Sequence, residues 1–251
     1  MSPEAKERLD LLVQRLAGVS RSKAQGLIRT GAVSDADGNK LDKPGLRLPV
    51  DTRLLIAEGP RYVSRGGEKL EAALTAFSPP IAGRDVLDVG ASTGGFTDCL
   101  LQHGAARVFA VDVGYGQLAW RLRQDPRVVV FERTNIRALR LEALPGPAGF
   151  FVADCSFISL RLVLPAVAPL LQPDVGGIAL IKPQFEAGPD QVSRGGVVRD
   201  PAVRDRVVDE VLEAARTHGF TPNGVIPSPL LGPAGNVEFL AYLVRDDARR
   251  P

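Results

Sequence analysis

Cysteine, histidine and long apolar runs are scarce in this chain of 251 residues. Its two cysteines, Cys99 and Cys155, are too few for a disulfide framework and lack the spacing of a metal-binding motif. Both are expected to be small, buried packing residues. Prolines break the apolar stretches well short of the roughly 18 residues that a membrane span needs, and the amino terminus has no apolar signal core. These absences argue against disulfide-rich, metal-motif and membrane-spanning proteins, and they favour a cytoplasmic location.

The composition is that of a globular protein, with 45% hydrophobic residues and a net charge of +2. Residues 1–60 contain ten Lys or Arg and eight Asp or Glu, so the positive excess lies there. The length allows one large domain or a small domain followed by a medium one. Gly59-Pro60 and Gly66-Gly67 are typical of a boundary. We therefore expect domains at 1–58 and 66–251, joined by a linker at 59–65.

The amino-terminal part predicts two short helices. Leu9, Leu12, Val13 and Leu16 have the spacing of one apolar helical face over residues 8–16. A second helix is predicted over residues 20–31, because Ser20 can cap its start and Gly31 can end it. Residues 11–34 contain four basic side chains and no acidic one. Taken alone, this charge can also belong to a solvated helix face.

From residue 83 onward, apolar runs typical of strands alternate with helical patterns. This alternation predicts an α/β fold in which helices cover both faces of a mostly parallel sheet, with ligands bound beyond the carboxyl ends of its strands. A covering helix is expected at 201–217, capped by Asp200. The predicted strands are 86–89, 108–111, 128–131, 150–153, 178–181, 225–226 and 239–244.

The stretch Asp85–Thr97 is an apolar strand that ends in a glycine-rich turn and opens into a helix. It lacks the Gly-Lys-Ser/Thr of a phosphate-binding loop and the G-x-G-x-x-G of dinucleotide enzymes, so a nucleoside cofactor without a pyrophosphate fits better. Asp112 lies 24 positions after Asp88, at the end of the second strand. Its carboxylate can accept hydrogen bonds from a ribose diol or stabilise a turn.

Several charged residues follow strands or begin helices. Asp154 and Lys182 each end a strand, where they can hold a hydroxyl group for attack or form a structural ion pair. Glu238 precedes the last strand and Lys69 lies near a helix start, and residue type alone predicts exposure for both. The helical spacing around Trp120 favours core packing over a role in cofactor binding.

The amino-terminal region resembles the RNA-binding module named after ribosomal protein S-four. The resemblance covers residues 8–58 and rests on Arg8-Leu9-Asp10, Ser20–Gln25, Leu27-Ile28 and Gly31-Ala32-Val33. Ser34–Lys40 is longer and more acidic than the usual hairpin of that module. The resemblance implies phosphate contacts without sequence readout. The RNA-binding candidates are Arg8, Arg21, Lys23, Arg29, Arg61 and Arg65.

Four separated residues, Lys69, Asp154, Lys182 and Glu238, resemble the Lys-Asp-Lys-Glu tetrad of FtsJ-related ribose 2'-O-methyltransferases. Their surroundings resemble the TlyA or hemolysin-A family in particular. The matching segments are Ser64–Leu70, Asp88–Thr97, Asp154–Leu160, Lys182–Glu186 and Gly235–Phe239.

This second resemblance implies a Rossmann-like class I methyltransferase with a mostly parallel, seven-stranded sheet and a reversed final strand. It also implies S-adenosylmethionine as methyl donor, a ribosomal RNA ribose, favouring cytidine, as acceptor, ribosomal subunits as partners and no required metal. The tetrad would be catalytic, with Lys182 orienting or deprotonating the hydroxyl group. The residues implied in cofactor binding are Asp88, Gly90, Ala91, Ser92, Thr93, Gly94, Gly95, Phe96, Asp112 and Asn135.

Two other functions compete with this hypothesis. A silent RNA-binding or ribosome-assembly factor would keep the fold and bind RNA without a methylated product, although the intact tetrad argues against it. Direct membrane lysis, suggested by the hemolysin name, is disfavoured because no long basic amphipathic helix is predicted.

Overall fold

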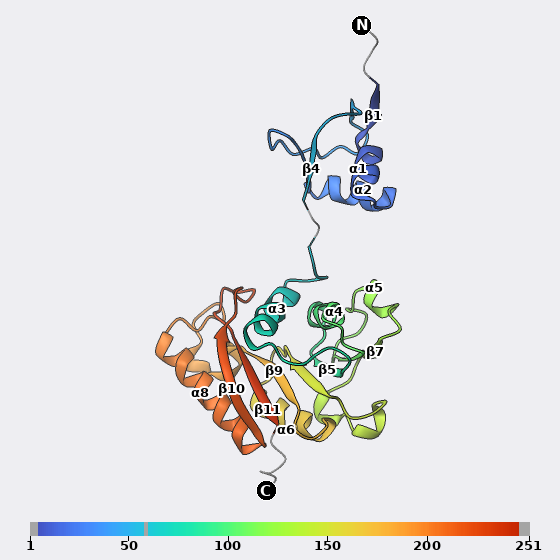
Figure 1. Cartoon of the computed structure of the whole chain (residues 1–251). Coiled ribbons are helices and arrows are strands. Elements are labelled where there is room, and N and C mark those ends of the chain that lie inside the picture. Colours follow the sequence, from blue (N-terminus) through green and yellow to red (C-terminus); the bar gives the residue numbers. More distant parts are fainter. Residues whose placement is uncertain (1–4, 58–59, 246–251) are drawn as a thin grey trace. The chain divides into compact units, whose positions relative to one another are not determined.

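The computed structural model describes residues 5–57 and 60–245, and Figure 1 shows the chain. The chain divides into two compact units, Met1–Arg61 and Tyr62–Pro251. This division falls within the stretch 59–65 that the sequence predicts as a linker. Gly59, which belongs to the predicted boundary, lies outside the described residues.

The first unit pairs two short helices over a small core. Leu9 and Val13 of α1 are buried with Ala24 and Ile28 of α2, and the Ser20 hydroxyl caps α2 by accepting the backbone N–H of Lys23. β1 pairs with β3 and β2 pairs with β4, both antiparallel. The elements are β1 Lys6–Arg8, α1 Leu9–Ala17, α2 Arg21–Arg29, β2 Val33–Asp35, β3 Arg47–Pro49 and β4 Leu54–Ile56.

Asp10 organises the charged groups of this unit. Its carboxylate is fully buried and accepts hydrogen bonds from the side chains of Arg8, Arg21 and Gln25. The guanidinium of Arg8 contributes most to holding the Asp10 pKa far below its ordinary value. The start of α1 is therefore tied to α2 by a network that the apolar pattern does not predict.

The second unit contains a seven-stranded sheet with the order β10-β11-β9-β8-β5-β6-β7. β5 to β9 are mutually parallel, whereas β11 runs antiparallel to both β9 and β10. The predicted mostly parallel sheet and its reversed final strand are therefore confirmed. The strands are β5 Asp85–Val89, β6 Arg107–Val111, β7 Val128–Phe131, β8 Phe150–Ala153, β9 Gly176–Ile181, β10 Phe220–Pro227 and β11 Phe239–Arg245.

Helices cover both faces of this sheet (Figure 1). One face packs on α3, α4 and α5, and the other on α6 and α8. Successive strand residues face opposite ways, so Val86 is buried with the first group and Leu87 with the second. The helices are α3 Gly66–Phe77, α4 Gly95–Gln102, α5 Trp120–Arg123, α6 Leu160–Val167, α7 Pro183–Glu186 and α8 Pro201–Thr217, with 3-10 turns η1 Ile136–Ala138, η2 Leu141–Ala143, η3 Ala168–Leu170 and η4 Pro189–Gln191.

Two predictions of core packing were wrong. Trp120 is 72% exposed, because α5 is a single short turn whose neighbours Leu118 and Leu122 take the buried positions. Leu16 is 57% exposed, because it lies in the last turn of α1, past the small core.

Cys99 is fully buried as predicted, whereas Cys155 is only partly buried. No helix formed by the described residues has the length and apolar character to cross a membrane.

Candidate active site

The loop between β5 and α4 requires glycine at two positions. Gly90 has a φ of 84°, and a Cβ atom there would lie 2.5 Å from the carbonyl oxygen of Asp154. Gly94 has a φ of 94°, and its Cβ would lie 2.3 Å from the Leu122 side chain. A side chain at either residue would be strained and would also clash. Gly90 therefore lets the loop pass close to the end of β8, and Gly94 lets it pass close to Leu122 of α5.

The same loop is held against β6 by hydrogen bonds. The backbone N–H groups of Gly90 and Ala91 donate to the Val111 carbonyl. One Asp112 oxygen accepts the Ser92 N–H at 2.8 Å, and the other accepts the Gly114 N–H at 2.7 Å. Asp112 thus has the turn-stabilising role that its residue type allows, and these bonds fix its carboxylate at the end of β6.

A cavity of about 470 Å³ opens beside this carboxylate. Its wall combines polar side chains, including Asp112 and Asn135, with apolar ones such as Val111 and Ile136. The Asn135 side-chain oxygen accepts the Arg137 N–H, which fixes the amide at the start of η1. Apolar walls with a few fixed polar groups are typical of small-molecule sites.

A second cavity of about 460 Å³ lies on the other side of the glycine loop. Lys69, Asp154 and Lys182 all line it. Gly90, Ser92, Asp154 and Ser156 line both cavities. Both cavities therefore meet at the loop, where a group held in one can face a group held in the other.

The four predicted tetrad residues form two ion pairs. The Lys69 ammonium lies 2.5 Å from a carboxylate oxygen of Glu238, and the Lys182 ammonium lies 2.5 Å from one of Asp154. Lys182 also donates a hydrogen bond of 3.0 Å to the Ser156 hydroxyl. The chain thus brings together side chains from α3 and from the ends of three strands.

Lys69 and Glu238 are buried, with relative exposures of 8% and 1%. The exposure expected from residue type was therefore wrong for both. Their burial has a physical reason, since each neutralises the other in a region where neither charge would be stable alone.

Asp88 lies beneath the loop rather than in either cavity. It is fully buried within β5, and one of its oxygens accepts the Thr97 hydroxyl at 2.6 Å. Burial raises the Asp88 pKa to about 7, and the nearby carboxylates of Asp154 and Asp112 act in the same direction. Asp88 therefore anchors the start of α4.

The other loop residues predicted to bind cofactor fall mostly in the second cavity. Ala91, Thr93, Gly95 and Phe96 line that cavity only. Gly94 lines neither cavity and instead packs against Leu122.

Sequence reasoning assigned no role to Ser64, Ser156 or Phe157. Ser64 and Ser156 line the second cavity. Phe157 is 90% exposed, has a φ of 64°, and its ring lies 5.1 Å from that of Phe185. These three residues lie within the segments that resemble the TlyA or hemolysin-A family, and that resemblance is the sequence signal that could have identified them.

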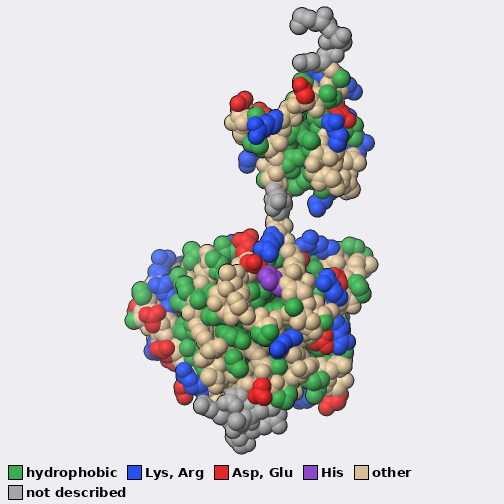
Figure 2. Space-filling model, in the orientation of Figure 1, with side chains coloured by type: hydrophobic (Ala, Val, Ile, Leu, Met, Phe, Trp, Pro, Cys, Tyr) green, Lys and Arg blue, Asp and Glu red, His purple; other side chains and the backbone are tan. Residues whose placement is uncertain are grey.

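The basic residues predicted to bind RNA have different surroundings. Lys23 and Arg29 are exposed on α2, and Arg61 is also exposed. Arg8 and Arg21 pair with Asp10 but remain 40% and 51% exposed. Arg65 lines the second cavity and donates to the Leu231 carbonyl. On the face in Figure 2, basic side chains are spread over both units.

Comparisons with known proteins agree with this architecture. Residues 62–245 match the family of FtsJ-like methyltransferases. The 16S/23S rRNA (cytidine-2'-O)-methyltransferase TlyA of Mycobacterium tuberculosis is 51% identical over 234 residues, which cover 92% of this chain and 87% of that protein. A solved structure from Streptococcus thermophilus, provisionally named a hemolysin, is 43% identical with a TM-score of 0.74, and the match covers 97% of this chain and 90% of that one.

A more distant solved structure shares the fold alone. An S-adenosylmethionine-dependent methyltransferase from Mesorhizobium loti is 16% identical with a TM-score of 0.51, over 69% of this chain and 96% of that one. The family match spans nearly all of the second unit, including both cavities and all four tetrad residues. The chain belongs to the FtsJ-like methyltransferase family.

Proposed function

We propose that this methyltransferase transfers the methyl group of S-adenosylmethionine to the ribose 2'-hydroxyl of a cytidine in ribosomal RNA. The observation that carries the proposal is the meeting of two cavities at the glycine loop, one beside Asp112 and the other containing Lys69 and Lys182. The name of the Mycobacterium tuberculosis relative supports the choice of nucleotide and RNA.

The cofactor is assigned to the cavity beside Asp112. The fixed carboxylate of Asp112 suits a ribose diol, Asn135 lies at the same wall, and the apolar residues suit a purine. The loop residues Gly90 and Ser92 belong to both cavities. The methionine part of the cofactor would lie along Gly90 and Ser92, and its methyl group would point towards Asp154.

Lys182 is the residue assigned to the ribose hydroxyl. S-adenosylmethionine supplies an already activated methyl group, so the protein must chiefly align the attacking oxygen, and proximity of this kind contributes roughly 7 kcal/mol or more. Lys182 either orients the hydroxyl as an ammonium or takes its proton as a neutral amine, while Asp154 and Ser156 hold its Nζ in place. Lys69 is positioned by Glu238. None of these steps needs a metal.

The first unit is assigned to RNA docking, as an S-four-like domain over residues 1–58. Lys23 and Arg29 present charge from α2 to phosphates. The side chains of Arg8 and Arg21 are partly exposed, and their guanidinium groups are held in place by ion pairs with Asp10. Arg61, at the end of the first unit, and Arg65, in the second, are further candidates for phosphate contacts, and the substrate would be a cytoplasmic ribosomal subunit.

The test is transfer of labelled methyl groups to ribosomal subunits by the wild type and by Lys182→Ala. Loss of a general base or an orienting group typically lowers the rate by about 10²- to 10⁴-fold, and cofactor affinity should change little. The control is Arg216→Ala, an exposed position on α8, which should transfer normally. Undiminished transfer by Lys182→Ala contradicts the assigned role, and absence of any wild-type product favours the silent RNA-binding factor.

A further inference from the structure

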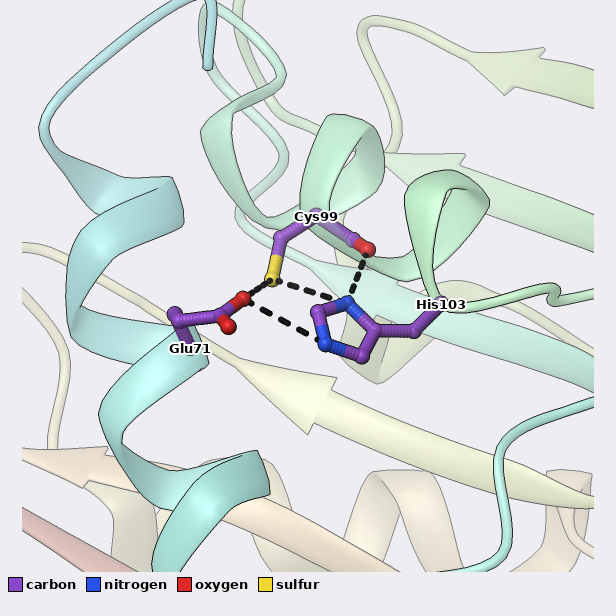
Figure 3. A group of neighbouring side chains, drawn as sticks. All are labelled: Glu71, Cys99 and His103. Carbon is purple, nitrogen blue, oxygen red and sulfur yellow. Dashed lines mark hydrogen bonds and ion pairs between the residues drawn. The ribbon is translucent and has the colours of Figure 1, made fainter. Parts of the chain in front are cut away.

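Outside both cavities, three side chains that commonly bind metals meet between α3 and α4 (Figure 3). Cys99 lies within α4 and His103 at its end, one helical turn further on, while Glu71 comes from α3. One ligand atom from each side chain lies within 4.8 Å of the other two. The cluster therefore joins two elements that the sequence alone does not connect.

The hydrogen bonds define the state of the imidazole. Nδ1 of His103 lies 2.9 Å from the Cys99 carbonyl oxygen, which can only accept, so Nδ1 carries the proton. Nε2 then presents a lone pair and lies 3.3 Å from a Glu71 carboxylate oxygen. Two electron-rich atoms at this distance are stabilised by a proton between them or by a bound cation. Metal-bound histidines commonly show the same Nδ1–H to carbonyl bond.

The distances from the Glu71 oxygen to its two neighbours are close to those of a tetrahedral ion. Zn²⁺ binds sulfur at about 2.3 Å and nitrogen or oxygen at about 2.0–2.2 Å, so the ligand atoms of a tetrahedral site lie roughly 3.3–3.7 Å apart. The Glu71 oxygen lies 3.3 Å from Nε2 of His103 and 3.8 Å from Sγ of Cys99. The ligand atoms of the three residues lie within 4.8 Å of one another. Sγ of Cys99 lies 3.7 Å from Nδ1 of His103, so the imidazole ring would turn to bring Nε2 to the sulfur.

We propose that Glu71, Cys99 and His103 bind one Zn²⁺ ion that fastens α3 to α4. The fourth position suits a water molecule, and the Tyr62 hydroxyl, which donates to Glu71, helps to hold that carboxylate in place. The Glu71 and His103 side chains are 27% and 30% exposed, so an ion can enter. Cys99 loses its proton on binding. Because Lys69 lies on α3 two residues before Glu71, the ion stabilises the helix that carries it and takes no part in methyl transfer.

The chain offers matched controls, because it has two cysteines and two histidines. Zinc affinity is measured on tag-free, chelator-treated protein by competition with a chromophoric chelator, for the wild type, Cys99→Ser and His103→Gln. Cys155→Ser and His218→Gln remove the same residue types outside the cluster. We expect one zinc per chain in the wild type and both controls. Loss of either ligand should weaken binding by more than the roughly 10- to 100-fold that loss of an outer-shell partner costs.

Cobalt and heat provide independent measurements. Co²⁺ should give the wild type a thiolate-to-metal charge-transfer absorption that is absent from Cys99→Ser and present in Cys155→Ser. Zinc should raise the midpoint of thermal unfolding of the wild type but not of His103→Gln. Circular dichroism confirms that each variant is folded. Substoichiometric zinc in the wild type, or equal affinity in Cys99→Ser, overturns the proposal, and neither result bears on the proposed methyl transfer.

Discussion

The buried carboxyl group of Asp88 makes the stability of the second unit depend on pH. Burial raises its pKa from 3.8 to about 7, so the folded protein keeps a proton that the unfolded chain releases. Asp88→Asn retains an oxygen that can accept the Thr97 hydroxyl, and it removes the titration. Comparing the wild type with this variant isolates the contribution of one carboxyl group.

The magnitude follows from the difference in pKa. Below about pH 4 the carboxyl is protonated in both states, and its contribution to stability is fully present. Between pH 4 and pH 7 the unfolded chain ionises first, so the wild type loses stability as the pH rises. Roughly three pH units at about 1.4 kcal/mol each give a loss of about 4 kcal/mol. Above pH 7 both states are ionised and the loss is complete.

The assay is urea unfolding at pH values from 4 to 8, followed by far-ultraviolet circular dichroism. The single tryptophan is a poor probe because Trp120 is 72% exposed. The free energy of unfolding of the wild type relative to Asp88→Asn should fall steadily up to pH 7 and then level off. Any constant cost of burying the asparagine amide cancels in this pH dependence. A difference that stays flat from pH 4 to pH 8 refutes the reasoning.

Three further predictions concern the active site. Lys69→Ala and Glu238→Ala should each lower the free energy of unfolding by about 3–5 kcal/mol, because each leaves a buried charge unpaired. In urea unfolding, the double variant should lose much less than the sum of the two single losses. Gly90→Ala should abolish cofactor binding in calorimetry and should destabilise the protein more than Gly83→Ala does. Gly83 is a matched control, because its φ of 74° is similar but no atom lies within 4 Å of an added Cβ. Equal losses of stability in the two variants would contradict the predicted clash at Gly90. Asp112→Asn should weaken cofactor binding by roughly 10- to 100-fold in the same assay, because it removes a charged acceptor, and unchanged affinity would rule out its ribose role.

The sheet was largely predictable because its strands are runs of apolar residues that end at turn or charged residues. β10 was only partly predicted, since Pro222 and Gly224 are typical of a turn. The strand instead continues through them with a bulge between Pro222 and Gly224. Periodicity also cannot tell where a helix ends, which explains the errors at Leu16 and Trp120.

The site was predictable only by resemblance. The burial of Lys69 depends on Glu238, 169 positions away, and no local pattern links them. The cluster of Glu71, Cys99 and His103 escaped prediction for the same reason, because one of its three residues comes from a different helix. The carboxylate of Asp10 likewise draws its partners from beyond its own helix. Such long-range charge pairs depend on the folded topology.

The most direct measurement of the central claim is the chemical identity of the methylated product. Ribosomal RNA treated with the protein and S-adenosylmethionine is digested to nucleosides and examined by mass spectrometry. We predict 2'-O-methylcytidine from the wild type and strongly reduced amounts from Lys182→Ala. A methyl group found on a base, or equal amounts of 2'-O-methylcytidine from both proteins, would contradict the account.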